Sequence, residues 1–330
     1  MSVDAPGAAT GRSGESFRHP ALFYRGREEY LATTVPFVTG GLAAGEPVAV
    51  AVPRPNLELL REALGRELGG DLKRVELLDM AQVGRNPGRI IPGVLRAFAD
   101  RHPHGRIRII GEPIWAGRTG EEYPACLQHE ALINLAFAGR PVSILCPYDA
   151  AALDPRVLAD AATTHPVLVD RAAERVSRGF APRWAIAAGN VPLPDPFGDS
   201  GRERGAEGVA TVRFDHTTLA PVRALAVREA AAGGLDPDRV LDVELAVNEL
   251  AANSLAHGGG SGTLRVWIAG GRLVCEISDG GQITDPLAGR RPVDPATPGG
   301  RGLLLVNQLA DLVRTHSVPG ATTIRAYFRL

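Results

Sequence analysis

In the first half of the chain, short apolar runs alternate with longer stretches of helical period. The apolar runs predict strands at residues 48–52, 74–78, 106–111 and 142–146. The stretches between and after them predict helices at 27–43, 56–68, 87–101 and 121–138. Asp154 followed by Pro155 is typical of a further helix start. This alternation favours an α/β fold with a mostly parallel sheet.

The pattern changes twice in the second half. Residues 179–208 are rich in Pro, Gly and Asp, with prolines at every second position from Pro192 to Pro196, which favours an extended linker. The segments after it predict strands at 212–214, 263–269, 272–278, around 313, and at 323–328, with helices at 219–232, 237–256 and 303–312. Because helices and antiparallel strands are segregated, we expect an α+β two-layer sandwich.

These patterns divide the chain into four parts. We expect a disordered N-terminus at 1–18, a first domain at 19–165, a helical and Pro-rich linker at 166–205 and a second domain at 206–330. The length of 330 residues, of which 45% are hydrophobic and 22% charged, suffices for two cores.

Charge and cysteine content narrow the class of protein. The 36 Lys and Arg residues nearly balance the 37 Asp and Glu residues, so no global field attracts nucleic acid or a membrane surface. The three cysteines, Cys126, Cys146 and Cys275, have no Cys-x-x-Cys spacing and suggest reduced, buried thiols. No apolar stretch approaches the length of a membrane span, so we expect a cytoplasmic protein.

Candidate chemistry begins on the helix predicted at 237–256 and continues one residue beyond it. Glu249, Asn253 and His257 are spaced i, i+4 and i+8 and therefore share one helix face. The Asn253 carbonyl suits a hard cation that bridges phosphates, and Glu249 is placed to accept a proton from an attacking hydroxyl or water. Alone, the triplet also fits a solvated polar face. The apolar positions expected to pack in the core are Leu245, Val247, Leu250 and Leu255.

Two glycine-containing segments follow. Asp279, at the end of a predicted strand, precedes Gly280 and Gly281; its carboxylate suits the exocyclic amine of adenine, although an isolated Asp-Gly is usually a plain turn. The segment 299–302, Gly-Gly-Arg-Gly, precedes an apolar helix whose free N-terminal amides suit phosphates, although it also fits a flexible loop.

Taken together, the three segments resemble the N, G1 and G2 boxes of the GHKL (Bergerat-fold) ATPases. The stretch 249–258, Glu-Leu-Ala-Ala-Asn-Ser-Leu-Ala-His-Gly, resembles the N box of anti-sigma-factor serine kinases. This resemblance implies bound ATP and Mg²⁺, with Glu249 as the catalytic base, Asn253 as the metal ligand and Asp279 on the adenine. The other nucleotide-binding residues that it implies are His257, Gly281, Gly300, Arg301 and Gly302.

Residues 283–298 would then form the lid over the nucleotide. Their Pro and Gly content suits a mobile cover. Arg290, Arg291 or Arg301 would offset phosphate charge, with no preference among the three.

Histidine kinases share these boxes, so the rest of the chain must distinguish a histidine kinase from an anti-sigma-factor serine kinase. No His-Glu-x-x-x-Pro element occurs, and we interpret His129-Glu130 as a packing pair. A kinase acting on a Ser or Thr of a partner protein is therefore favoured. The resemblance implies an anti-sigma-factor antagonist as substrate and a sigma factor as second partner. A histidine kinase-like protein, a nucleotide-controlled binding module without phosphotransfer, and a homodimer all stay open.

The first domain resembles the MEDS sensory domain that accompanies such kinases in actinobacterial regulators. The resemblance lies in residues 19–24, 37–46, 84–87 and 111–115. The carboxyl ends of a parallel sheet form a crevice suited to a small-molecule or protein signal. Glu112, Trp115 and Arg118 are the candidate signal-binding residues, and the alternative, that they only hold loops together, is equally open. No P-loop motif is present, which argues against a second nucleotide site.

Overall fold

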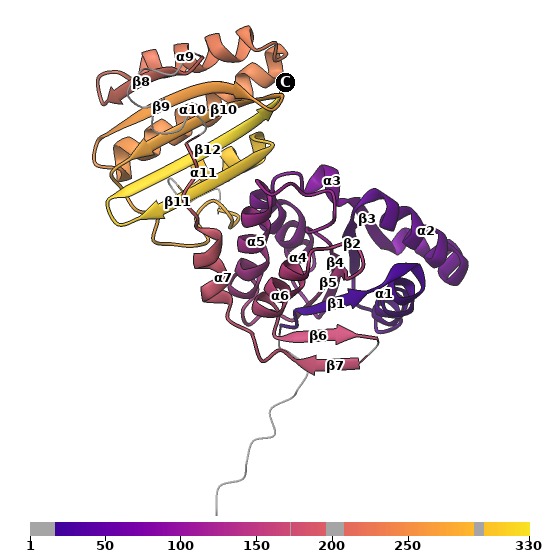
Figure 1. Cartoon of the computed structure of the whole chain (residues 1–330). Helices are drawn as coiled ribbons and strands as arrows, with labels where there is room; N and C mark the ends of the chain where they lie inside the picture. The colour runs from indigo at the N-terminus through magenta and orange to yellow at the C-terminus, as the bar shows by residue number, and fades with distance from the viewer. Residues whose placement is uncertain (1–16, 172, 196–207, 294–299) are drawn as a thin grey trace, which may run out of the picture.

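A computed structural model of the chain describes residues 17–171, 173–195, 208–293 and 300–330. The chain builds two sheets, each with its own hydrophobic core (Figure 1). Most of the N-terminus expected to be disordered, part of the expected linker and the last part of the expected lid lie outside the described residues.

The first sheet has seven strands in the order β3-β2-β4-β5-β1-β6-β7. Neighbours from β3 through β6 run parallel, and β7 runs antiparallel to β6. The prediction of an α/β domain with a mostly parallel sheet is confirmed. The strands are β1 (Pro20–Tyr24), β2 (Val48–Val52), β3 (Val75–Asp79), β4 (Ile107–Gly111), β5 (Val142–Asp149), β6 (Val167–Asp170) and β7 (Ala173–Val176).

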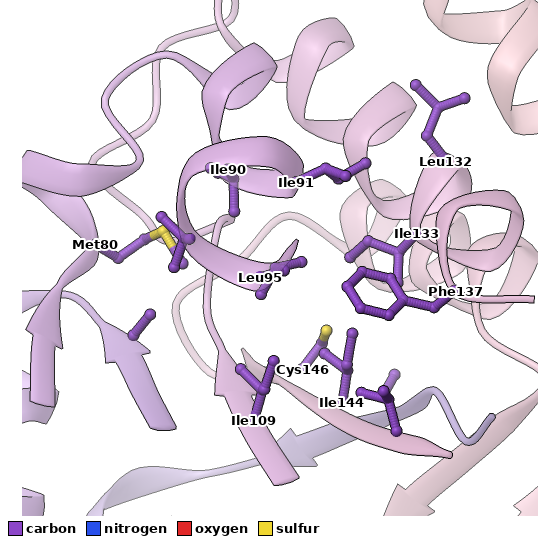
Figure 2. Close-up of a cluster of buried hydrophobic side chains, with 14 of the residues drawn as sticks. Met80, Ile90, Ile91, Leu95, Ile109, Leu132, Ile133, Phe137, Ile144 and Cys146 are labelled. Atoms are coloured by element: carbon purple, nitrogen blue, oxygen red, sulfur yellow. The ribbon is translucent and has the colours of Figure 1, made fainter. Parts of the chain in front are cut away.

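Helices cover both faces of this sheet (Figure 1). One face packs under α1 and α2, and the other packs under η3, α5 and α6, where Figure 2 shows Phe137 and Cys146 among the buried side chains. The helical elements are α1 (Gly26–Ala43), α2 (Arg54–Leu68), η1 (Gly69–Arg74), α3 (Met80–Val83), η2 (Pro87–Arg89), η3 (Ile91–Arg96), α4 (Ala97–Arg101), α5 (Tyr123–Ala136), α6 (Pro155–Thr164) and α7 (Pro182–Gly189).

The helix predicted at 87–101 is not one regular α-helix. It begins as the 3-10 turn η2, widens into the π-turn η3 and ends as α4. Pro92 lies in the π-turn and has no amide hydrogen to donate, so the regular helical ladder is interrupted there.

The first sheet extends past residue 165, the predicted end of the first domain. Strands β6 and β7 fall in the segment expected as linker, and both pair within the sheet. All four residues of β7 are exposed, so no apolar pattern marks it as a strand. Helix α7 packs against α5 through Ala185, which is fully buried.

The second sheet is antiparallel, in the order β11-β12-β10-β9-β8. Its core lies between the sheet and three helices, which confirms the α+β two-layer sandwich (Figure 1). Asp236 caps the longest helix by accepting a hydrogen bond from the Arg239 amide. The elements are β8 (Ala210–Asp215), α9 (Leu219–Ala232), α10 (Pro237–His257), β9 (Ser261–Ala269), β10 (Arg272–Asp279), α11 (Gly302–Leu309), β11 (Leu312–Val318) and β12 (Ala321–Arg329).

One core assignment on α10 is wrong. Val247 and Leu250 are buried as predicted, but Leu245 is 48% exposed and Leu241, one turn earlier, is 55% exposed. The buried stripe of α10 runs through Val243 and Val247, and a residue two positions from either lies about 200° away around the helix.

The two domains contact each other directly. Ala125 of α5 packs with Trp267, Val274 and Tyr327 on the sheet face opposite α10. Glu121 accepts a 2.5 Å hydrogen bond from the Arg272 guanidinium. Among the described helices, none combines the length and the apolar character needed to cross a bilayer.

Candidate nucleotide site

A cavity of about 650 Å³ opens in the second domain between α10, the end of β10 and the start of α11. Several of the predicted nucleotide-binding residues line it, together with apolar side chains that suit a planar ring. The predicted residues that line it are Asn253, His257, Asp279, Gly281 and Gly300.

Glu249 and Asn253 lie against the first residue of α11. A Cβ atom placed on Gly302 would lie 2.7 Å from Glu249 Oε2 and 3.1 Å from Asn253 Nδ2. Both side chains are half-buried and project from successive turns of α10, as the i, i+4 spacing predicts. A carboxylate and an amide carbonyl are thus held beside the N-terminal end of a helix, which suits a phosphate chain with its cation.

Asp279 is fixed at the other end of the cavity. Ser254 donates a 2.6 Å hydrogen bond to Asp279 Oδ2, and the Gly281 amide donates a 2.8 Å bond to Oδ1. A carboxylate held from both sides presents its remaining lone pairs in a defined direction, as recognition of an amino group requires.

Gly281 is required by close approach of the backbone. A Cβ atom at this position would lie 2.5 Å from the His257 carbonyl oxygen and 2.9 Å from Gly258 Cα. The Thr322 hydroxyl donates to the Gly281 carbonyl at 3.1 Å. The G1 segment is therefore packed against the end of α10, and exposed His257 lies at the rim of the cavity.

The described part of the expected lid, 283–293, is anchored to the first domain. Leu287 is 2% exposed and packs in the core of the first domain. Arg290 points the same way and donates to the Pro87 carbonyl, whereas Arg291 lines the cavity and lies 3.6 Å from Asp285. Of these two arginines, Arg291 is the one that faces the nucleotide cavity.

Asn86 connects the first domain to α11. It is fully buried, and its Nδ2 donates to the main-chain carbonyl of Asn307 at 2.9 Å. Its Oδ1 accepts from the Val313 amide at 3.3 Å. Asn307 Nδ2 in turn donates to the Gly289 carbonyl at 3.1 Å. A continuous chain of hydrogen bonds therefore joins the first domain, α11 and the lid segment.

Among the candidate signal-binding residues, Glu112 is a buried acid at the carboxyl end of β4. It is 2% exposed and accepts hydrogen bonds from Asn56 Nδ2 at 2.9 and 3.0 Å and from the Tyr24 hydroxyl at 3.2 Å. Burial raises its pKa to about 8, an effect that the two donors only partly oppose.

Arg118 and Trp115 have other neighbours. The Arg118 guanidinium lies 4.1 Å from the centroid of the Trp115 ring and donates to the carbonyl oxygens of Gly84, Arg85 and Pro113. These contacts tie two loops together. Arg118 and Trp115 have different partners from Glu112. The contacts therefore do not form one binding site from the three candidates.

Sequence reasoning missed several residues that build the site. Ser254 directly follows Asn253 on α10. Its position four residues after Leu250, on the same helix face, was a signal that could have identified it. Thr322 lies in β12, and the partner of its hydroxyl depends on which strands pair. Asn86 acts across the domain interface. No local signal marks Thr322, and the resemblance of residues 84–87 to the MEDS domain does not reveal the partner of Asn86 in the other domain.

Comparison with protein families assigns both domains. Residues 18–166 match the MEDS family, the methanogen/methylotroph, DcmR sensory domain, and residues 212–328 match the histidine kinase-like ATPase domain. A comparison with curated proteins found no match.

Two solved structures show limited similarity. The RsbU and RsbW domains of Rv1364c from Mycobacterium tuberculosis are 23% identical, with a TM-score of 0.29, over 37% of this chain and 32% of that chain. The Acinetobacter baumannii histidine kinase AdeS is 11% identical, with a TM-score of 0.23, over 39% of this chain and 72% of that chain. The family matches and the observed folds agree: the chain combines a MEDS sensory domain with a histidine kinase-like ATPase domain of the GHKL type.

Proposed function

We propose that this protein is an ATP-dependent serine/threonine kinase that phosphorylates an anti-sigma-factor antagonist and controls a sigma factor. The observation that carries the proposal is the placement of Glu249 and Asn253 beside the start of α11, at the edge of a cavity large enough for a nucleotide. The ATPase domain match supports nucleotide binding by this half of the chain.

The residues at the α11 end suit ATP with Mg²⁺. Asn253 would contribute its amide oxygen to the cation, and the glycine-lined start of α11 would bind phosphate oxygens through Gly300, Arg301 and Gly302. The cation supplies neutralisation of phosphate charge. Glu249 would accept the proton of the attacking hydroxyl, because its carboxylate lies beside the same helix start.

The Asp279 end suits the adenine ring. The carboxylate would accept a hydrogen bond from the exocyclic amine, and its orientation is set by Ser254 and the Gly281 amide. His257 and Gly281 line the same end of the cavity.

Burial supports transfer to a partner protein rather than to the chain itself. His129 and Glu130 are 1% and 0% exposed, so this pair cannot present an imidazole to an ATP domain. Between β7 and β8 the described residues form one helix, α7, which packs on α5, and they contain no histidine. Exposed Leu241 and Leu245 offer an apolar patch on α10 for a protein partner, either the antagonist, the sigma factor or a second copy.

Contacts across the domain interface support control by the first domain. The lid segment is held through Leu287, and α11 is held through Asn86. A signal bound in the first domain, with Glu112 as the preferred contact and Trp115 and Arg118 as loop-positioning candidates, would change how these segments close over the nucleotide.

The test is phosphotransfer from γ-labelled ATP with Mg²⁺, with and without candidate antagonist proteins. We expect acid-stable label on a Ser or Thr of the partner. Acid-labile label on the chain itself would indicate a histidine kinase-like activity instead. Measurable ATP binding with no label on any partner would indicate a nucleotide-controlled binding module.

A further inference from the structure

Four side chains with metal-ligating atoms face one another inside the first domain. They are His19 just before β1, Glu130 on α5, Cys146 on β5 and His165 between α6 and β6, and their ligand atoms all lie within 4.8 Å of one another. Each residue is at most 1% exposed. Figure 2 shows Cys146 pointing from its strand toward the covering helices.

The neighbours of His19 determine which ring nitrogen faces the cluster unprotonated. Asn134 Nδ2 donates to the Thr164 carbonyl at 2.8 Å, so its Oδ1 is directed at His19 Nδ1, 3.2 Å away. An amide oxygen only accepts, so Nδ1 carries the proton. The Nε2 atom of the neutral ring therefore presents a lone pair to the cluster.

His165 is oriented in the same way. Its Nδ1 lies 2.9 Å from the Ala161 carbonyl oxygen, which only accepts hydrogen bonds, so this nitrogen also carries the proton. Its Nε2 points into the cluster. Imidazole ligands of metal ions are held in this manner, with the outer N–H bonded to a carbonyl or an amide.

Among the inner atoms of the cluster, only the Cys146 thiol carries a proton; it can be shared with His19 Nε2, which leaves His165 Nε2 and the Glu130 oxygens without a hydrogen-bond partner. Both Nε2 atoms lie next to Glu130 Oε2, at 3.4 Å from His19 and 3.3 Å from His165, and the Cys146 sulfur lies 3.4 Å from His19 Nε2. Among the described residues, no donor reaches either Glu130 oxygen with hydrogen-bond geometry, although the Cys146 thiol and the Tyr148 hydroxyl lie close enough to interact with this carboxylate. A buried carboxylate that faces two lone pairs is unfavourable unless a positive charge lies between them.

We propose that this cluster binds one Zn²⁺ ion through His19, Glu130, Cys146 and His165. Zinc with bonds of about 2.0–2.3 Å requires ligand atoms about 3.3–3.7 Å apart at the corners of a tetrahedron. Three of the six separations between ligand atoms, 3.3, 3.4 and 3.4 Å, fit this requirement, and the other three are at most 4.8 Å, so the side chains would close around the ion. Four protein ligands leave no position for water, so the site is structural rather than catalytic.

Charge balance supports the same ion. Two neutral imidazoles, one carboxylate and one thiolate carry two negative charges, which a divalent cation cancels in a site with no solvent contact. Binding releases the thiol proton of Cys146 to solvent and forms a zinc–sulfur bond, with no change of oxidation state.

The ion would link four segments that pack together on one side of the first sheet. It would join the start of the first strand to α5, β5 and the end of α6, all on the face of the sheet opposite α1 and α2. Because α5 also contacts the ATPase domain through Ala125, the zinc site would stabilise the part of the sensory domain that faces the ATPase domain.

The test is the metal content of the untagged full-length protein, measured by inductively coupled plasma mass spectrometry. We expect about one zinc ion per chain. Replacement by Co²⁺ should produce a thiolate-to-cobalt charge-transfer absorption, since one ligand is a cysteine. Cys146→Ala should lose this absorption. The matched control is Cys126→Ala, a buried cysteine of the same domain outside the cluster, which should keep it.

The wild-type measurements decide the proposal even if the variants do not fold. Zinc below about a tenth of an ion per chain, with no cobalt–thiolate absorption after reconstitution, would overturn it. Stoichiometric iron or copper would overturn the assignment to zinc. Equal loss of the absorption in the Cys146 and Cys126 variants, with both chains folded by circular dichroism, would exclude Cys146 as the ligand.

Discussion

The side-chain amide of Asn86, in the sensory domain, donates a 2.9 Å hydrogen bond to the main-chain carbonyl of Asn307, in the ATPase domain. Asn307 lies on α11, the helix whose first residue contacts Glu249 and Asn253. One buried side chain therefore connects the MEDS domain to the helix beside Glu249 and Asn253, at the proposed phosphate end of the cavity.

Asn86→Ala should loosen this connection. Loss of a buried hydrogen-bonding group costs about 1–3 kcal/mol, and Asn307 would then hold the Gly289 carbonyl less firmly. We expect faster amide hydrogen exchange in residues 283–293 without nucleotide. The control is Gln82→Ala, an exposed amide side chain four residues earlier. Unchanged exchange in the lid segment of the Asn86 variant would contradict the role given to this contact.

Gly302→Ala should weaken nucleotide binding. The added methyl group would lie 2.7 Å from Glu249 Oε2 and 3.1 Å from Asn253 Nδ2, so both side chains would have to move away from the start of α11. We expect an increase of about tenfold in the Kd for Mg·ATP, measured by isothermal titration calorimetry. Gly65→Ala on α2, with no atom within 4 Å of the added carbon, is the control. Equal affinity of the two variants would show that the start of α11 does not approach the ligand.

Glu249→Gln should separate chemistry from binding. It keeps the shape of the side chain and removes the proton acceptor, so phosphotransfer should fall by about a hundredfold to ten-thousandfold while the Kd for ATP changes little. A fully active variant would eliminate Glu249 as the base.

Asn253→Ala, in contrast to Glu249→Gln, should weaken nucleotide binding itself. Without the amide oxygen, binding of Mg·ATP should weaken, and the affinity should lose most of its dependence on Mg²⁺ concentration. The measurement is a titration of nucleotide at several Mg²⁺ concentrations. Asn248→Ala, on the same helix but bonded to Arg223, serves as the control. Retained Mg²⁺ dependence in the Asn253 variant would assign the cation to another ligand.

Glu112 should make the stability of the chain depend on pH. Its pKa is raised from 4.5 to about 8, so between these values the folded chain holds a proton that the unfolded chain has lost. The contribution of Glu112 to the free energy of unfolding is therefore greatest below pH 4.5 and is lost as the pH rises toward 8.

Glu112→Gln removes this titration. The stability of the variant relative to wild type should rise with pH from about 5 to about 8, by a few kcal/mol at most. Denaturant unfolding at a series of pH values measures this difference. Glu58→Gln, an exposed carboxylate on α2, should show little such trend. A flat difference for Glu112→Gln would show that the acid is ionised in the folded chain.

Several helix boundaries followed closely from the sequence because their signals are local. The spacing of apolar residues placed α9 at 219–232, the same bounds as observed, and Asp236 with Pro237 marked the start of α10. The strand β7 and the π-turn η3 were not predictable in this way. The first is exposed at every residue, and the second depends on a proline inside an otherwise helical pattern.

The candidate nucleotide site was partly predictable for the same reason. Glu249 and Asn253 are four residues apart, so they share one face of the helix whatever its surroundings. A strand end followed by glycines places Asp279 at a turn. Leu245 was assigned wrongly to the core, because the apolar residues of α10 outnumber the positions that one face can bury.

The sequence was enough to predict most of the elements, both fold classes and the candidate nucleotide-binding segments, because helical and strand periods and turn residues act over a few neighbouring positions. The folded structure was needed to show that Ser254 fixes Asp279, that Asn86 reaches Asn307 and that two histidines face Glu130 and Cys146. These contacts join residues up to 221 positions apart. Their geometry depends on how sheets and helices pack, and no local periodicity encodes it.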